Sequence, residues 1–243
     1  MSNAEELPQP PWQRSPKRPA KKKREPITQE AIVETALRVL DEEGLDGLSM
    51  RRVAEELGTG AASLYWHVGS KDGLLDLVMD RVIGEQHVPD PEPERWEEQL
   101  KEVARTMRAT ILAHRDIVEL SLGRIPMGPN ALEWSERVLA VLRAGGVPDR
   151  LAVLGHHLLI AAINGFTMDE SADYTPTTGK ERPDEELANM AGDYIASLPR
   201  DRFPNMAEVA QYYTVIDPEE RFELLLDLFV DGLAKRAASE SPT

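Results

Sequence analysis

Three consecutive residues, Tyr65, Trp66 and His67, carry a hydroxyl, an indole N–H and an imidazole within the stretch LYWHVGSKDGLL. Consecutive residues of a helix are about 100° apart, so these three side chains cannot all face one core. Leu64 and Val68, four residues apart, are expected to form the buried side of the same short helix. At least one ring must therefore face outward, where it can donate a hydrogen bond to a partner such as a phosphate.

Two arginines begin a neighbouring helix at a position that disfavours cations. Arg51 and Arg52 follow Ser49 closely, and the amino end of a helix carries partial positive charge. Their i+4 partners, Glu55 and Glu56, stand in the less favourable order for ion pairs within a helix. We therefore expect an external anion, rather than internal pairing, to explain the two arginines.

Polar caps and glycine stops predict that four helices position these side chains. We expect helices from Thr28 to Gly44, from Ser49 to Gly58, from Gly60 or Ala61 to Gly69 and from Ser70 to about Glu85. The second and third, joined by a glycine-containing turn, fit a helix-turn-helix, whose second helix lies in the major groove of DNA. The small residues Ala61, Ala62 and Ser63 would let that helix approach base edges, and Lys71 would meet a phosphate just after it.

Charge is distributed unevenly along the chain. The formal net charge is −15, of which residues 1–75 carry −1 and residues 76–243 carry −14. Residues 14–24 contain seven Lys or Arg and no acidic residue, and residues 1–26 contain six prolines. We expect residues 1–26 to form a disordered basic arm. This composition is typical of a solvated tail. It is also typical of a segment that becomes ordered on DNA, and both interpretations stay open.

The Pro-rich segment VPDPEPE, residues 88–94, marks the expected boundary between a first domain, residues 27–87, and a second, residues 94–238. Apolar residues at helical spacing, such as the stripe from Leu132 through Val138 to Leu142, predict that the second domain is also helical. The run 151–166 is apolar nearly all round, which indicates burial on both sides, one of them a subunit interface. Gly155, His156, His157 and Asn164 make this run too short and too polar for a membrane span, so we expect no membrane partner. The predicted fold class is all-α.

The sequence contains no cysteine, which suits a cytoplasmic protein. It has no nucleophile elbow, phosphate loop or HExxH motif, so we expect no enzymatic activity, and we expect no cofactor. The adjacent His156 and His157 cannot chelate one metal ion, and no metal site is expected. Polar or adaptable side chains on apolar helices are candidates for ligand binding, with core packing as the alternative for each. These are Met107, Trp134, His156, Asn164, Phe166 and Met168.

The segment LSMRRVAEELGTGAASLYWHVGSKDGLL resembles the DNA-binding domain of the tetracycline repressor (TetR) family, and LGRIPMGPNALEW and NGFTMDES are similar to its tetracycline-repressor-like C-terminal domain. The resemblance implies an all-helical homodimer with a helix-turn-helix DNA-binding domain and a ligand-binding and dimerisation domain. It implies base contacts from Arg51, Ala61 and Ala62, backbone contacts from Met50, Ser63, Trp66, His67 and Lys71, and an intermediate role for Tyr65. Arg52 joins this set as the second arginine of the pair described above.

Three positions depart from the tetracycline repressor pattern. Ala61 and Ala62 stand where that protein has longer side chains, so we expect a different double-stranded DNA operator. Ser121 stands where it has a magnesium-binding histidine, so we expect a small-molecule effector other than a magnesium–tetracycline complex. The predicted function is ligand-responsive transcriptional regulation at the nucleoid, most simply repression from a palindromic operator that an inducer relieves. The alternatives are a constitutive DNA-binding protein without an effector, which a body without a cavity would favour, and a small-molecule-binding protein.

Overall fold

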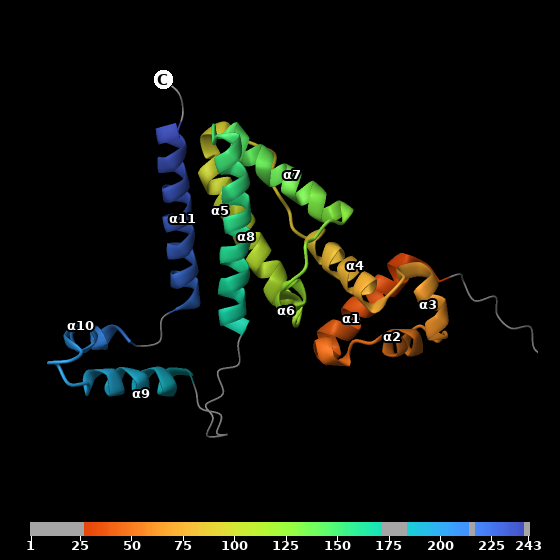
Figure 1. Cartoon of the computed structure of the whole chain (residues 1–243), viewed down its shortest axis with the longest axis horizontal. Coiled ribbons are helices and arrows are strands. Elements are labelled where there is room, and N and C mark those ends of the chain that lie inside the picture. The colour runs from red at the N-terminus through yellow and green to blue at the C-terminus, as the bar shows by residue number, and fades with distance from the viewer. Residues whose placement is uncertain (1–26, 172–183, 214–216, 241–243) are drawn as a thin grey trace, which may run out of the picture.

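The computed structural model describes residues 27–171, 184–213 and 217–240, and every regular element in these ranges is a helix (Figure 1). The predicted all-α class is confirmed. The basic arm predicted for residues 1–26 lies outside these ranges. We call residues 27–87 the head, residues 93–171 with 217–240 the body, and residues 184–213 the distal unit.

The head consists of α1 (Gln29–Gly47), α2 (Met50–Glu56), α3 (Ala61–Val68) and α4 (Lys71–Ile83). The three predicted N-caps are confirmed. The hydroxyls of Thr28, Ser49 and Ser70 accept hydrogen bonds from backbone N–H groups three residues later, at 3.2, 3.1 and 2.9 Å. Each bond satisfies one of the donors that the first turn of a helix leaves unpaired, which explains why the helices begin at these residues.

A tight turn between α2 and α3 fixes the helix-turn-helix. Gly58 has a φ of +62°, a left-handed conformation that costs glycine little because it has no Cβ. α1 ends in effect at the predicted stop, because Gly44, with φ +77° and ψ 178°, breaks the helical geometry before one further short turn. Leu40, Val53 and Leu64 are almost completely buried where α1, α2 and α3 meet, and this small core holds α3 on the surface of the head.

The body is a helical bundle. It consists of a 3-10 turn, η2 (Pro93–Arg95), and then α5 (Trp96–Ala113), α6 (Ile117–Ser121), α7 (Pro129–Ala144), α8 (Asp149–Ser171) and α11 (Pro218–Glu240). α5 contacts α7, α8 and α11, and α4 of the head packs on α7, α6 and α5. As a result, buried residues of the head and body form one continuous apolar cluster. α4 is thus part of both regions, as Figure 1 shows.

The body differs from the sequence-based expectation in two details. The predicted stripe on α7 is rotated: Leu132 is exposed, while Ala131, Trp134 and Val141 are buried with Val138 and Leu142. The reason is that α4, α5 and α8 all pack on α7, so its buried face is set by three neighbours rather than one. The short helix α6 had no expected counterpart, because five residues are too few to display a helical period.

α8 is a long helix with a strongly apolar middle. Its best 18-residue window has a mean hydropathy of 1.5, so it is long and apolar enough to span a bilayer, contrary to the expectation that the run is too short and too polar. By itself this is weak evidence, because the core helices of many proteins meet the same criterion, and 44% of the window is buried inside the protein. The rest includes Val153, Leu154 and Leu158, which are exposed.

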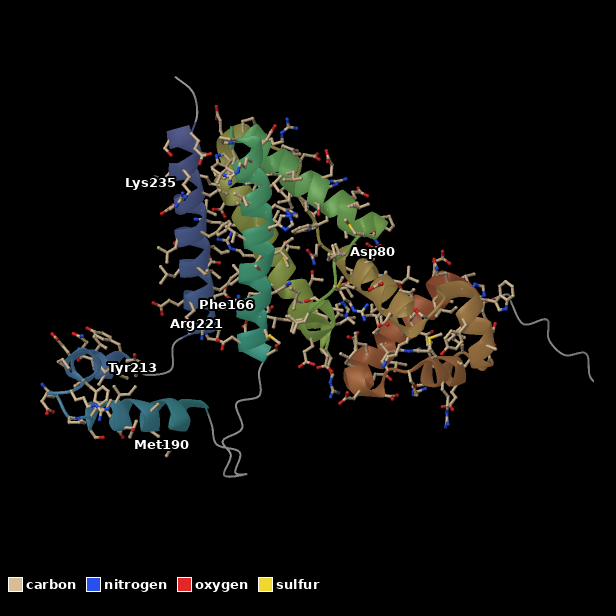
Figure 2. All side chains as sticks on the ribbon, in the orientation of Figure 1. Asp80, Phe166, Met190, Tyr213, Arg221 and Lys235 are labelled. Atoms are coloured by element: carbon tan, nitrogen blue, oxygen red, sulfur yellow. The ribbon has the colours of Figure 1, made fainter. Side chains whose placement is uncertain are left out.

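The distal unit contains α9 (Asp184–Ala196), α10 (Pro204–Val209) and the 3-10 turn η3 (Ala210–Tyr212), which pack on one another. It projects from the end of the bundle at which α8 ends and α11 begins (Figure 1). Met190 and Tyr213 lie on this unit in Figure 2, and both are exposed. The unit buries little apolar surface of its own within one chain.

Candidate DNA interface and ligand cavity

The outer surface of α3 presents the aromatic residues singled out in the sequence. Leu64 and Val68 are buried against the head, whereas Trp66 is 91% exposed and Tyr65 and His67 are also exposed. The expected orientation of this helix is therefore confirmed. Gln29 donates a hydrogen bond of 2.9 Å to the backbone oxygen of His67, which ties the end of α3 to the start of α1. Fixed in this way, α3 presents an indole and a phenol to solvent on a rigid helix.

The two arginines of α2 differ in their availability. Arg51 is 87% exposed and pairs with Glu55 through Nε at 2.8 Å. Arg52 is 30% exposed and lies between Glu43 at 2.7 Å and Glu56 at 2.8 Å, and hydrogen bonds to these carboxylates raise its pKa. The expectation that internal pairing explains the arginines badly is therefore wrong for Arg52, because Glu43 reaches it from α1. Arg51 is the freer of the two.

The other predicted DNA contacts lie around α3, with one exception. Ala62 and Lys71 are exposed, and Ala61 and Ser63 are partly buried at the start of the helix. Met50, in contrast, is only 6% exposed and belongs to the apolar cluster of the head. Its side chain packs α2 against the rest of the head, which does not favour the predicted DNA contact, and that contact stays a prediction.

A cavity of about 140 Å³ lies where α4 meets the body. Its walls are mostly apolar, and α4 itself contributes Met79, Val82 and Ile83. The polar residues along it are Gln86, Ser121, Arg124, Ser135 and Asn164. Ser121 donates a hydrogen bond of 2.6 Å to the backbone oxygen of Val118. A mostly apolar enclosure with a few polar groups is the usual form of a small-molecule site.

Three of the six predicted ligand residues, Met107, Trp134 and Asn164, line this cavity. Trp134 Nε1 is buried and has no hydrogen-bond partner among the described residues, so one wall contains an unused donor. An unpaired buried donor is costly, and a ligand or a water molecule that accepts from it would remove that cost.

The other three predicted ligand residues do not line this cavity, and their roles as ligand contacts stay predictions. The ring of Phe166 packs on Phe222 at 5.1 Å between centroids, close to Arg221 (Figure 2). Met168 is exposed near the end of α8. His156 is buried beside Trp134, with ring centroids 5.6 Å apart, and burial lowers its pKa, as does the neighbouring His157. Residue type alone could not tell which face of α8 borders the cavity.

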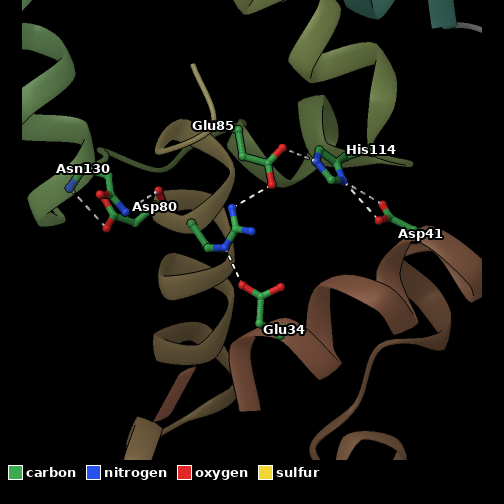
Figure 3. Close-up of polar contacts among 7 residues, drawn as sticks. Glu34, Asp41, Asp80, Glu85, His114 and Asn130 are labelled. Carbon is green, nitrogen blue, oxygen red and sulfur yellow. Dashed lines mark hydrogen bonds and ion pairs between the residues drawn. The ribbon is translucent and has the colours of Figure 1, made fainter. Parts of the chain in front are cut away.

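Polar contacts join the head to the body around the cavity (Figure 3). Asp80 of α4 is buried and accepts hydrogen bonds from the backbone of Asn130 and Ala131, at 3.4 and 2.9 Å, at the start of α7. Gly128 is required beside it, because a Cβ there would lie 2.2 Å from the carboxylate of Asp80. A buried carboxylate that receives N–H groups at a helix start is favourably placed.

A second contact centres on His114, which follows α5. Its Nδ1 is 3.1 Å from Asp41 of α1, and its Nε2 is 3.0 Å from Glu85 just after α4 (Figure 3). Burial lowers the pKa of His114, but hydrogen bonds to Glu85 and Asp41 outweigh it, so the pKa lies above its ordinary value. Arg81 joins the same network through Glu34 and Glu85.

The head is a helix-turn-helix with an exposed second helix, and α4 joins it to a body that contains a cavity. This arrangement is typical of a DNA-binding regulator that carries its own ligand-binding domain. Residues 32–78 match the family model "Bacterial regulatory proteins, tetR family", and residues 88–237 match "Tetracyclin repressor-like, C-terminal domain". The chain therefore belongs to the TetR family. Members of this family are transcriptional regulators that bind DNA and small-molecule ligands, typically as dimers, and the predicted ligand-responsive regulation is confirmed at this level.

Individual relatives agree with this assignment. The HTH-type transcriptional repressor DrrR1 of Streptomyces coeruleorubidus is 32% identical, with 93% of this chain and 86% of that protein covered. The crystal structure of apo ActR from Streptomyces coelicolor is 44% identical with a TM-score of 0.81, over 89% of this chain and 99% of that chain. ActR in complex with actinorhodin is 45% identical with a TM-score of 0.78, over 86% and 96%.

Proposed function

We propose that the protein binds a palindromic DNA operator as a homodimer and leaves it when a small molecule occupies the body cavity. The exposure of Trp66, on a helix held rigidly by the head core, is the observation that carries this proposal. A large aromatic residue gains nothing for the fold by standing in water, whereas its N–H can bind a phosphate at a groove edge. ActR, a similar protein, has been solved in complex with actinorhodin, which supports an effector for this chain as well.

We assign the DNA contacts to the outer face of the helix-turn-helix, within a DNA-binding domain of residues 27–87. Ala61, Ala62 and Arg51 would face bases, and Tyr65 would lie between bases and backbone. Ser63, Trp66, His67, Lys71 and Arg52 would contact the backbone. Arg52 would have to release Glu43 or Glu56 to do so, so we expect it to contribute less than Arg51. The basic residues 14–24 would add contacts that do not depend on sequence.

We assign dimerisation to α8 and α11, within a domain of residues 94–238. The two helices pack side by side, and each has exposed leucines four residues apart, Leu154 and Leu158 on α8 and Leu224 and Leu228 on α11. Residues at this spacing lie on one face of a helix, so the pair forms a broad apolar surface. A second copy related by a two-fold axis would bury the same surface on both chains.

The effector would act through α4, because this helix forms one wall of the cavity and also connects to α3. Two heads must stand roughly 34–36 Å apart to enter successive major grooves. A ligand that favours another spacing weakens operator binding, and coupling of about 1–3 kcal/mol would release DNA by about 5- to 150-fold. The cavity also argues against the constitutive alternative. We place this activity at the nucleoid in the cytoplasm and consider it to be binding rather than catalysis.

Selection of randomised duplex DNA with the full-length protein tests the proposal. We expect enrichment of an inverted repeat whose half-sites lie about one helical turn apart or a multiple of it, and two protomers bound for each duplex by native mass spectrometry. The proposal fails if no duplex is enriched above the starting library, or if one protomer binds an asymmetric site with full affinity.

A further inference from the structure

Arg124 is the charged residue among the described side chains that line the cavity. It lies in the loop between α6 and α7, and its side chain is partly buried, with 20% exposed. The wall beside it is apolar, with Ile117, Val118 and Pro126. A cation in such surroundings favours an anionic partner, because an unpaired charge in an apolar enclosure is costly.

The present partners of Arg124 are on the head. Its guanidinium is 2.9 Å from the carboxylate of Asp72 and 2.5 Å from that of Asp76, one turn apart on α4. Both carboxylates are exposed, and ion pairs of this kind are weak because water solvates the partners almost as well. Asp72 also lies in the first turn of α4, where the helix dipole favours a carboxylate without any partner. The head can therefore lose Arg124 at little cost.

We propose that Arg124 selects effectors that carry a carboxylate on an apolar body, and that the carboxylate takes Arg124 away from Asp72 and Asp76. This inference rests on the proposed function, since it assumes that the cavity is the effector site. The planar guanidinium binds a carboxylate through two parallel hydrogen bonds, and the apolar wall strengthens that pairing relative to the solvated pairs on α4. The apolar body of the ligand fills the space beside Met79, Met107 and Trp134.

The exchange has a direct consequence for the reading helix. Asp72 and Asp76 belong to the first turns of α4, and only two residues lie between the end of α3 and the start of α4. Arg124 now ties these turns to the loop of the body, and a third carboxylate would repel both aspartates as well as release them. The position of α3 relative to the body can then change. Arg124 would thus both bind the ligand and couple ligand binding to the position of the head.

Isothermal titration of the full-length protein with 2-naphthoate and, separately, with 2-naphthamide tests the inference. The two probes share an apolar ring system and differ in charge. The variants are Arg124→Gln and the double variant Asp72→Asn with Asp76→Asn. Arg115→Gln is the matched control, because Arg115 also contacts the head, through the backbone oxygen of Glu42, and does not line the cavity.

We expect the wild type and the Arg115 variant to bind 2-naphthoate about tenfold or more tightly than 2-naphthamide, and Arg124→Gln to bring the ratio near one. The double aspartate variant should bind 2-naphthoate more tightly than the wild type, since the competitors for Arg124 are gone. A purely structural role for Arg124 predicts the opposite for that variant. An unchanged preference in Arg124→Gln, weaker 2-naphthoate binding in the aspartate variant, or no binding of either probe overturns the inference.

Titration of the selected duplex DNA in the same samples separates this inference from the proposed function. Suppose that 2-naphthoate binds through Arg124 but does not change the affinity of the protein for the duplex. This result would support the recognition of the carboxylate by Arg124 and contradict the proposed release of DNA. If the wild type binds the duplex but binds both probes equally well, the proposed function as a regulator stands. The proposed role of Arg124 is then wrong.

Discussion

The head and the body use their tryptophans in opposite ways. Trp66 on α3 is 91% exposed, whereas Trp134 on α7 is 7% exposed and forms part of a cavity wall. The head presents two short helices, α2 and α3, whose outer surface is available for a partner. The body is a thicker bundle, and its proposed partner sites are a cavity and the outer faces of α8 and α11. We therefore propose recognition of DNA for the exposed aromatic residue of the head, and both packing and ligand contact for the buried one of the body.

The junction between the two regions has a mixed character. Its centre is apolar, because α4 shares one buried cluster with α5 and α7. Its margin consists of ionic and hydrogen-bonded contacts from Asp80, His114 and Arg124. Apolar packing holds α4 in place, whereas the ionic contacts can exchange partners at small cost. This division explains how a ligand in the body could alter the head without unfolding either.

Replacing each of the two tryptophans by alanine is the largest test of the contrast. Trp134→Ala should lower the free energy of unfolding by about 3–5 kcal/mol, since it removes a buried ring and enlarges a cavity. Trp66→Ala should change it by less than about 0.5 kcal/mol, because the ring is in water. Urea unfolding followed by circular dichroism measures both. Equal losses of stability would remove the distinction between the two residues.

Charged residues on the outer face of the bundle should disrupt the dimer. Leu158→Asp on α8, or Leu228→Asp on α11, places a carboxylate in the proposed interface twice per dimer and should raise the dimer dissociation constant about 100-fold or more. Leu132→Asp on α7 is the control, since Leu132 is exposed on another face. Sedimentation equilibrium distinguishes the species. If Leu158→Asp and Leu228→Asp both stay dimeric, dimerisation occurs elsewhere.

The buried carboxylate at the junction should contribute a smaller amount. Asp80→Ala leaves the N–H groups of Asn130 and Ala131 without their acceptor and should cost about 1–3 kcal/mol of unfolding free energy. Asp46→Ala, at an exposed position on α1, is the control. Chemical denaturation gives the values. A loss confined to about 0.5 kcal/mol would mean that the head and body do not depend on this contact.

His114 predicts the smallest effect, a dependence of stability on pH. Because its pKa is raised above 6.5 in the folded protein, its contribution is fully present below about 6.5 and is lost as the pH rises through the folded pKa. His114→Gln should flatten this part of the profile, and His87→Gln, at an exposed position, should leave it as in the wild type. Melting temperatures between pH 5.5 and 8.5, an interval of about one unit or more on each side of an ordinary histidine pKa, provide the measurement. A wild-type profile that His114→Gln does not alter would show that the network is not responsible.

The sequence predicted the head well because its determinants are local. Thr28, Ser49 and Ser70 form caps with residues three positions away, and Gly58 sets a turn by its own backbone. The exposure of Trp66 then follows from the burial of Leu64 and Val68. Contacts that cross between helices escaped this reasoning, as the pairing of Arg52 with Glu43 shows.

The helices of the body were predicted from the sequence, but the residues that line its cavity could not be identified in the same way. Which face of a helix borders the cavity depends on how several helices pack, so Met107, Trp134 and Asn164 could not be separated from His156, Phe166 and Met168 by residue type. Arg124 lies in a loop without periodicity, and only its neighbours Asp72 and Asp76, some fifty residues earlier in the chain, give it a role. A cation within an apolar motif such as LGRIPMGP was the available signal.

Binding of the selected operator duplex by Trp66→Ala and by Tyr194→Ala, measured by fluorescence anisotropy, tests the central claim most directly. Both residues are exposed aromatics, one on α3 and one on α9. The account predicts that Trp66→Ala weakens binding about tenfold or more at an unchanged melting temperature, since a hydrogen bond to a charged phosphate is lost, while Tyr194→Ala binds as the wild type. Wild-type affinity in Trp66→Ala, or an equal loss in Tyr194→Ala, would contradict it.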